Sequence, residues 1–265
     1  MSTPTRPGRD DYTDFCDAVR SLCAIDLSQY KRGQMERRIR TFAGTRGAPE
    51  LPAYLTKLRR DRVELDAFLD RVTINVSQLW RHPEQWEALE RDVLPDLART
   101  GRIRAWSAGC SYGAEAFTLA AVAKTAVPRA LVTITGVDID ERMVAQARTG
   151  VFSAEDARAT PPGVMARWFT KRPDGTYEAR PELKAITRFE TGDLLRVRPR
   201  PAAYDLVLCR NTVIYFNDEV RDALHGRLAE ALRPGGYLVI GATERVSDPH
   251  AIGLTPTHPF TYRKS

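Results

Sequence analysis

The chain has 265 residues, of which 43% are hydrophobic and 28% are charged, and it carries a net charge of +6. No apolar run approaches the roughly 18 residues that a membrane-spanning helix needs, and the polar start, residues 1–11, lacks the apolar stretch of a secretory signal. These features predict a soluble cytoplasmic protein with an unstructured N-terminus. The four cysteines form no Cys-x-x-Cys pair and the four histidines are scattered, so neither a metal site nor a disulfide framework is expected.

The positive charge is concentrated in the N-terminal third of the chain. Between Ser28 and Arg62 there are ten Lys and Arg residues against three Asp and Glu residues. An anionic partner that docks on this stretch would explain the excess. An ordinary solvated helix surface would explain it equally well.

Residues 12 to about 72 are expected to be helical. Phe15, Val19 and Leu22 recur at helical spacing, and Phe68 and Val72 do so farther along. Glycines and prolines between residues 44 and 52 end one helix and start the next. The sequence therefore predicts a small, basic, all-helical domain over residues 10–72.

From residue 73 onward, apolar strands alternate with helices. The sequence predicts helices at 84–99, 114–126, 141–148 and 218–232, the last one stopped by Arg-Pro-Gly-Gly at 233–236, and strands at 103–107, 131–138, 188–191, 204–209 and 237–241, with a closing edge strand at 257–262. Continuously apolar strands that alternate with helices indicate a mostly parallel sheet covered on both faces. We therefore predict an α/β domain over residues 73–265.

A turn signal interrupts this alternation. Pro173-Asp174-Gly175 separates two short alternating stretches within residues 169–179. This pattern predicts a β-hairpin, and hence a small inserted β subdomain at about residues 168–190. An irregular loop is the alternative interpretation.

The turn that follows the first strand, Ser107 to Glu115, has the character of a ligand-binding loop. Gly109 and Gly113 let the backbone turn tightly and approach a ligand closely. The start of the next helix leaves N–H groups that can face an anionic or polar ligand. Because the turn is not the Gly-x-Gly-x-x-Gly of dinucleotide enzymes, it indicates by itself only a nucleotide-type site.

Polar side chains follow three further strands. Asp138 ends the second strand and can accept hydrogen bonds from both hydroxyls of a ribose. Capping of the following helix is the alternative role, and it suits Asp140 better than Asp138. Asp193 follows the third strand, and Arg210 and Asn211 follow the fourth, at the edge where open α/β sheets bind ligands.

This order of features resembles the Rossmann-like S-adenosylmethionine methyltransferases, and three motifs narrow the resemblance to the CheR family of chemotaxis receptor methyltransferases. Residues 73–81, Thr-Ile-Asn-Val-Ser-Gln-Leu-Trp-Arg, resemble its Asn-x-(Thr/Ser)-x-Phe-Phe-Arg signature. Residues 107–115 are similar to its Ala-Cys-Ser-x-Gly-Glu-Glu loop, and residues 209–216 to its Cys-Arg-Asn-Val-x-Ile-Tyr-Phe. The departures are Leu79-Trp80 for Phe-Phe, Ala114 for the first glutamate, Asp193 for Asn, and Ala242-Thr243 before Glu244 for His-Ser.

The resemblance implies which residues position the reacting groups, bind the cofactor and contact the receptor. Arg81 and Tyr215 would position the reacting groups. The residues implied in cofactor binding are Asn75, Ser77, Arg81, Gly109, Glu115, Asp138, Asp193, Leu194, Cys209, Arg210 and Asn211. Arg37, Arg38 and Arg40 would contact the clustered glutamates of receptor methylation helices.

The implied activity is S-adenosylmethionine-dependent methylation of glutamate side chains on chemoreceptors, with S-adenosylhomocysteine as the product. The implied partners are the cytoplasmic helices of these receptors and, as in some family members, a receptor C-terminal peptide that binds the hairpin by strand addition. Nucleic acid is not an expected partner. A non-catalytic regulator that binds the cofactor or its product is the alternative function.

Overall fold

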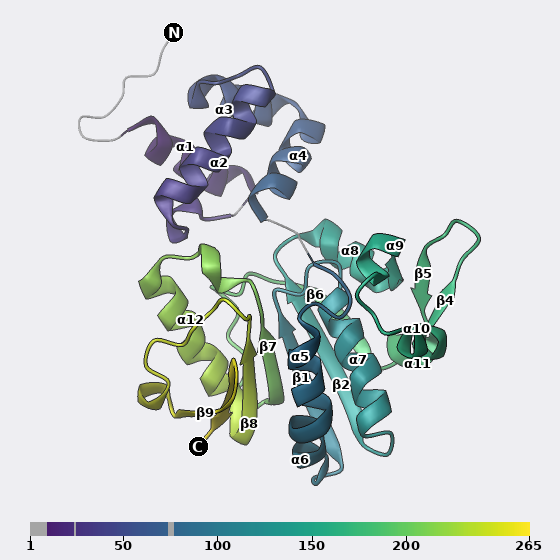
Figure 1. Cartoon of the computed structure of the whole chain (residues 1–265). Coiled ribbons are helices and arrows are strands. Elements are labelled where there is room, and N and C mark those ends of the chain that lie inside the picture. Colours follow the sequence, from purple (N-terminus) through teal and green to yellow (C-terminus); the bar gives the residue numbers. More distant parts are fainter. Residues whose placement is uncertain (1–9, 24, 74–76) are drawn as a thin grey trace. The chain divides into compact units, whose positions relative to one another are not determined.

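A computed structural model describes residues 10–23, 25–73 and 77–265 (Figure 1). Most of the predicted unstructured start, and the candidate residue Asn75, lie outside these ranges. The chain divides into two compact units, a helical unit of Met1–Asn75 with Tyr215–Val220, and a sheet unit of Val76–Ile214 with Arg221–Ser265. Among the described residues, no helix combines the length and the apolar character that a membrane crossing needs.

The helical unit is built around aromatic side chains. Its elements are α1 (Asp11–Cys23), the 3₁₀ turn η1 (Leu27–Gln29), α2 (Arg32–Thr45), α3 (Leu51–Arg60) and α4 (Arg62–Thr73). The ring of Phe68 lies 5.9 Å from that of Phe15 and 6.0 Å from that of Tyr54, both in edge-on geometry. The predicted all-helical N-terminal domain is thus confirmed.

The sheet unit contains a seven-stranded sheet in the order β6-β2-β1-β7-β8-β10-β9. Its strands are β1 (Arg102–Ala108), β2 (Leu131–Asp138), β6 (Thr187–Thr191), β7 (Tyr204–Cys209), β8 (Leu232–Ile240), β9 (Leu254–His258) and β10 (Thr261–Lys264). The pairs β6-β2, β2-β1, β1-β7 and β7-β8 are parallel, and β10 is antiparallel to β8 and β9. The predicted Rossmann-like α/β class is confirmed.

The principal helices of the sheet unit follow the predicted order. They are α5 (Pro83–Ala88), α6 (Leu94–Ala98), α7 (Ala114–Ala126), α8 (Glu141–Thr149) and α12 (Asp218–Ala231). The predicted single helix over 84–99 is interrupted by a π-helical turn, Leu89–Val93. Pro95 follows two positions after this turn, and it has no N–H group to donate the regular α-helical hydrogen bond.

Two strand predictions at the C-terminal end were wrong. Helix α12 ends just before Arg-Pro-Gly-Gly at 233–236, as predicted, but these residues already belong to β8, which begins at Leu232 rather than at 237 and whose pairing with β7 shifts register between Tyr204 and Leu206. A bulge of this kind tolerates Pro inside a strand. Residues 257–262 span the turn of the β9–β10 hairpin rather than a single edge strand, and β9 forms the sheet edge.

The predicted hairpin is confirmed, within a second and smaller sheet. β4 (Phe169–Lys171) and β5 (Tyr177–Ala179) pair antiparallel, and β3 (Val151–Phe152) pairs with the other side of β5. Short helices that the sequence did not reveal surround this sheet: α9 (Ala154–Ala157), α10 (Pro162–Trp168) and α11 (Pro181–Lys184). The later 3₁₀ turns are η3 (Val213–Tyr215) and η4 (His250–Ile252).

His225 on α12 should make the protein sensitive to moderate acid. The ring is 1% exposed, neither of its nitrogens has a hydrogen-bond partner within the described chain, and burial lowers its pKa to about 4 against the opposing charge of Asp222. The unfolded chain, with a His pKa of about 6.5, therefore binds a proton that the folded chain rejects. Stability should fall as the pH drops from about 6.5 to 4, by about 2 kcal/mol at pH 5.

The variant His225→Leu removes this titration. Its free energy of unfolding, measured by urea denaturation between pH 7 and 4.5, should depend less steeply on pH than that of the wild type. An unchanged pH slope would contradict the interpretation.

Candidate functional site

The predicted polar strand ends meet at one edge of the seven-stranded sheet. The loops that follow β1, β2, β6 and β7 leave the carboxyl ends of neighbouring parallel strands. The strand order reverses between β1 and β7, with β2 and β6 on one side and β8 on the other. A crevice outside such a reversal is where open α/β sheets bind their ligands.

The glycine turn after β1 is in close contact with the loops on both sides. The N–H groups of Gly109 and Cys110 donate to the carbonyl oxygen of Val137 on β2, at 2.8 and 3.1 Å. Gly109 has a φ of 81°, and a Cβ atom there would lie 2.5 Å from the hydroxyl oxygen of Thr212 in the loop after β7. Position 109 therefore requires glycine both for its backbone conformation and for the close approach of the neighbouring loop.

Asp138, at the end of β2, holds the glycine turn while keeping acceptor capacity. Its carboxylate accepts the N–H of Ser111 at 2.7 Å and that of Asp140 at 3.0 Å, one on each oxygen. A carboxylate has about four acceptor positions, so the bonds to the backbone leave room for ligand hydroxyls. Burial raises the pKa of Asp138, and the two N–H groups oppose this effect. Asp140 itself caps α8 by accepting the N–H of Arg142.

Arg210, directly after β7, is the centre of a buried polar network. Its guanidinium donates to Gln85 Oε1 at 2.8 Å and to the carbonyl oxygen of Arg81 at 2.6 Å, and it pairs with Glu115 at 3.4 Å. It also lies over the ring of Trp86, 4.8 Å from the centroid. The Arg210 side chain is 3% exposed, and burial lowers its pKa while the charge of Glu115 raises it. One side chain thus joins β7, α5 and α7.

Glu115 completes this network from the first turn of α7. Its carboxylate accepts the hydroxyl of Ser107 at 2.7 Å in addition to the contact with Arg210. Burial raises the pKa of Glu115, and the positive charge of Arg210 opposes that shift. The described contacts of Glu115 are therefore those of a residue that supports the loops at the sheet edge, and its predicted contact with the cofactor stays a prediction.

The segment that carries Arg81 has an unusual backbone. Trp80 and His82, on either side of Arg81, both have a φ of 57°, a left-handed conformation that is uncommon for residues other than glycine. Backbone strain of this kind persists where the surroundings fix it, and it clusters at functional sites. Here the Arg81 carbonyl is held by Arg210 and by the indole N–H of Trp86 at 2.9 Å.

The remaining candidate residues also lie around the loops of the sheet unit. The carbonyl of half-buried Ser77 accepts the hydroxyl of Tyr112. Asp193 accepts the N–H of Leu195 at 2.8 Å, and its neighbour Leu194 is buried. Cys209 is fully buried, which raises the pKa of its thiol well above the usual range. Asn211 has a φ of 59°.

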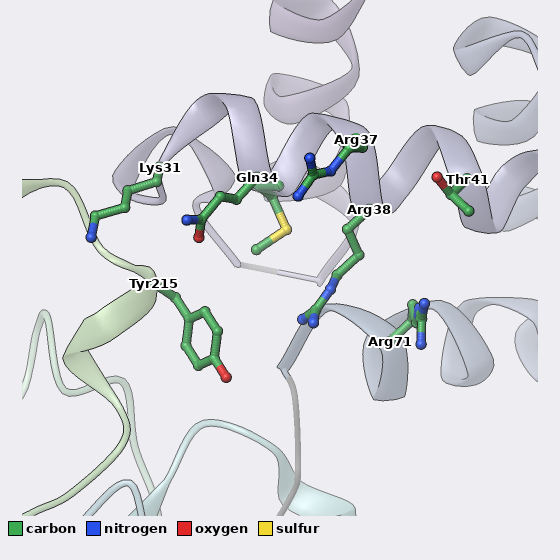
Figure 2. A pocket seen from close by; sticks show the side chains of 8 residues that line it. Lys31, Gln34, Arg37, Arg38, Thr41, Arg71 and Tyr215 are labelled. Atoms are coloured by element: carbon green, nitrogen blue, oxygen red, sulfur yellow. The ribbon is translucent and has the colours of Figure 1, made fainter. Parts of the chain in front are cut away.

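Tyr215 belongs to the helical unit, where it lines a pocket of about 320 Å³ (Figure 2). The Tyr215 carbonyl accepts the N–H of Lys31 at 2.9 Å, and the N–H of Asn217 donates to the carbonyl of Gln29 at 2.9 Å, so the 215–220 segment is fastened to the start of α2. The residues that line the pocket are Lys31, Gln34, Met35, Arg37, Arg38, Thr41, Arg71 and Tyr215.

The pocket is strongly basic and its lining contains no carboxylate. Figure 2 shows the Arg38 side chain extending between Tyr215 and Arg71, and its guanidinium lies 6.0 Å from the centre of the Tyr215 ring. Arg38 Nη1 is buried and has no hydrogen-bond partner in the described part of the chain. Burial lowers the pKa of Arg38, and the positive charge of Arg71 adds to this shift. A cation in such surroundings favours an anionic ligand.

The three predicted docking arginines on α2 differ in their surroundings. Arg37 and Arg38 line the pocket. Arg40 instead pairs with Asp11 at 2.7 Å and with Glu36 at 2.8 Å. Arg71 was missed by the sequence analysis because it lies on α4, 33 positions beyond Arg38, where no local pattern marks it.

Comparisons with known proteins find a matching family model for the helical N-terminal region and another for the sheet region. Residues 75–259 match the family model described as CheR methyltransferase, SAM binding domain, and residues 10–73 match the one described as CheR methyltransferase, all-alpha domain. A chemotaxis protein methyltransferase of Listeria monocytogenes is 33% identical over 257 residues, which cover 96% of this chain and 97% of that protein. Its counterpart in Listeria innocua is 32% identical over the same shares, and chemotaxis protein methyltransferase 1 of Pseudomonas aeruginosa is 28% identical over 90% of this chain and 91% of that protein.

The residues at the sheet edge fit S-adenosylmethionine. Asp138 retains acceptor positions for ribose hydroxyls, and the left-handed Gly109 and Gly113 let the backbone of the loop after β1 turn tightly at the sheet edge. The hydroxyl of Ser111 in the same turn is buried and has no hydrogen-bond partner within the described residues. An unsatisfied buried hydroxyl at this position is explained if a polar ligand completes its hydrogen bonding.

The variant Gly109→Ala should weaken cofactor binding by at least tenfold, because its Cβ atom would displace Thr212 and strain the left-handed backbone. Isothermal titration with S-adenosylhomocysteine measures the change. Gly226→Ala on α12 is the matched control, since a Cβ there meets nothing within 4 Å; it should bind with wild-type affinity and unfold at a slightly higher temperature. Normal binding by Gly109→Ala would contradict the predicted role of the turn.

Proposed function

The chain belongs to the CheR methyltransferase family, and from this we propose that it transfers the methyl group of S-adenosylmethionine to glutamate side chains of chemoreceptors, giving glutamate methyl esters in chemotaxis adaptation. Relatives named chemotaxis protein methyltransferase, which align over nearly their whole length, support the proposal. The observation that carries it is the joint presence of the cofactor-type loops at the sheet edge and the basic pocket of the helical unit.

A glutamate acceptor makes few chemical demands on the protein. With a pKa of about 4.3, a glutamate side chain is already ionised near neutral pH and needs no general base. The positive sulfonium of the cofactor activates the methyl group. The protein's own residues then have to bind the two partners, align them and exclude water.

Arg81 and Tyr215 are proposed to position the reacting groups. The planar guanidinium of Arg81 suits a carboxylate, and the left-handed residues Trp80 and His82 support a fixed backbone at this position. Arg81 would orient the acceptor rather than neutralise it, since a strongly paired carboxylate is a weaker nucleophile. Tyr215 would donate a hydrogen bond from its hydroxyl, or pack its ring against the sulfonium.

The basic pocket is proposed to receive acidic side chains of the receptor's cytoplasmic helices. Arg38 and Arg71 line a pocket whose described lining holds no carboxylate, and Arg38 Nη1 has no hydrogen-bond partner within the described residues, which supports this role. Arg37 lines the same pocket and would add to the attraction. Arg40 remains part of the proposed docking surface by its place on α2, although Asp11 and Glu36 already balance its charge.

A receptor C-terminal peptide is a second proposed contact. In the small sheet, β3 and β4 are the outer strands and β5 lies between them. An outer strand presents unpaired N–H and C=O groups to which an extended peptide can add. This contact would tether the receptor without taking part in the methyl transfer.

The test is to incubate the protein with S-adenosylmethionine labelled in its methyl group and with membranes of its host. Label on a receptor-sized band that base releases as methanol supports glutamate methylation. Tight cofactor binding without any transfer would contradict the proposal and favour a non-catalytic regulator.

Removing two positive charges of the pocket should separate receptor recognition from cofactor binding. The double variant Arg38→Gln/Arg71→Gln should lower kcat/KM for receptor methylation by about 10- to 100-fold, the range expected when a charge-assisted hydrogen bond is lost, while the Kd for S-adenosylhomocysteine stays unchanged. Arg62→Gln, which removes one charge from the exposed start of α4, serves as the control and should lower kcat/KM no more than twofold. Equal losses in both variants would indicate a non-specific charge effect.

A further inference from the structure

The loop after β7 is held by a buried carboxylate that the sequence motifs left without a role. Glu244, which follows β8, is 6% exposed. Its Oε2 accepts the N–H of Asn211 at 2.9 Å and that of Gly241 at 2.6 Å, and its Oε1 accepts the N–H of Val213 at 3.0 Å. One side chain thus accepts hydrogen bonds from the backbone of the loop after β7 and from that of the loop after β8.

The backbone that Glu244 holds is not one that this loop would adopt unaided. Asn211 is left-handed, with a φ of 59°, which is uncommon for a residue with a side chain. A conformation of this kind persists only where surrounding contacts over-determine it. The hydrogen bonds that Glu244 accepts from the N–H groups of residues 211 and 213 are such contacts, since they fix the backbone on both sides of Thr212.

The glycine at position 241 supports the same assignment independently. A Cβ atom on Gly241 would lie 2.7 Å from the backbone nitrogen of Asn211 and 2.7 Å from Glu244 Oε2. These distances are too short for any side chain, so the loop after β8 approaches the loop after β7 only because residue 241 is glycine. The carboxylate of Glu244 then fills the space between the two backbones.

We propose that Glu244 is a positioning residue of the cofactor site: it fixes the loop that presents Arg210 and Asn211 at the sheet edge, without touching the reacting atoms. Arg210 emerges from this loop into its network with Gln85 and Glu115, so a shift of the loop displaces the network as well. The inference rests on the proposed cofactor-binding role of the loop and is independent of which methyl acceptor the enzyme uses.

The variant Glu244→Gln tests the proposal at constant side-chain volume. The amide replaces one acceptor oxygen with an NH₂ group, which then faces backbone N–H groups that are also donors. The Kd for S-adenosylhomocysteine, measured by isothermal titration, should rise by about 10- to 100-fold. In methylation assays the KM for S-adenosylmethionine should rise more than kcat falls.

Asp205→Asn is the matched control for a purely structural effect. Asp205 is also a buried carboxylate of the sheet unit, and it accepts the backbone N–H of Arg104 at 2.7 Å and pairs with Arg233, near the start of β7. This variant should lower the melting temperature to a similar extent as Glu244→Gln while leaving the Kd within about twofold of the wild type. Equal weakening of cofactor binding by both variants would show that Glu244 acts through general stability, and would overturn the proposal.

Gly241→Ala provides a second route if Glu244→Gln does not fold. It keeps the carboxylate and forces the two loops apart, so it should also raise the Kd for S-adenosylhomocysteine by at least tenfold. Wild-type affinity in whichever of the two variants folds would overturn the proposal. Because the readout is cofactor binding, a failure to methylate receptors would refute the proposed function and leave this inference intact.

Discussion

The buried guanidinium of Arg210 is the contact on which the arrangement of the sheet edge depends. A charge removed from water is tolerated only when its donors are satisfied, and here Gln85, the Arg81 carbonyl and Glu115 share that task, with the Trp86 ring beneath. Loss of the Glu115 carboxylate would leave an uncompensated buried charge, at a penalty of about 3–5 kcal/mol. The network therefore forces the segment with Arg81, the first turn of α7 and the end of β7 into one geometry.

The loops at this edge gain their shape from each other rather than from local preference. Gly109 touches Thr212, Asp138 holds the N–H of Ser111, and Glu244 holds the loop around Asn211. Ser111 and Asn211, which are not glycines, adopt left-handed backbone conformations in these loops. Hydrogen bonds to Asp138 and Glu244 from the adjacent loops stabilise these conformations. This preorganisation suits a reaction in which the cofactor supplies the reactive group and the protein supplies alignment.

The helices and strands that depend on local sequence pattern were predictable. Strands β2 and β7 and helix α7 have the predicted bounds, because unbroken apolar runs and an alanine-rich helix are legible without tertiary context. The role of Glu244 was not predictable, since its partners Asn211 and Val213 lie more than 30 positions away. Arg-Pro-Gly-Gly at 233–236 correctly marked the end of α12, but only the irregular pairing with β7 shows that these residues already lie within β8. The segment 215–220 likewise joins the helical unit through contacts that no spacing rule contains.

The most direct test of this account is a double-mutant cycle on S-adenosylhomocysteine affinity with Glu115→Gln, Arg210→Met and the double variant, measured by isothermal titration. If the pair acts as one structural unit, each single variant loses at least tenfold in affinity and the double variant loses no more than the weaker-binding single variant. A double variant whose loss equals the product of the two single losses would show that Glu115 and Arg210 act independently, and would contradict the account.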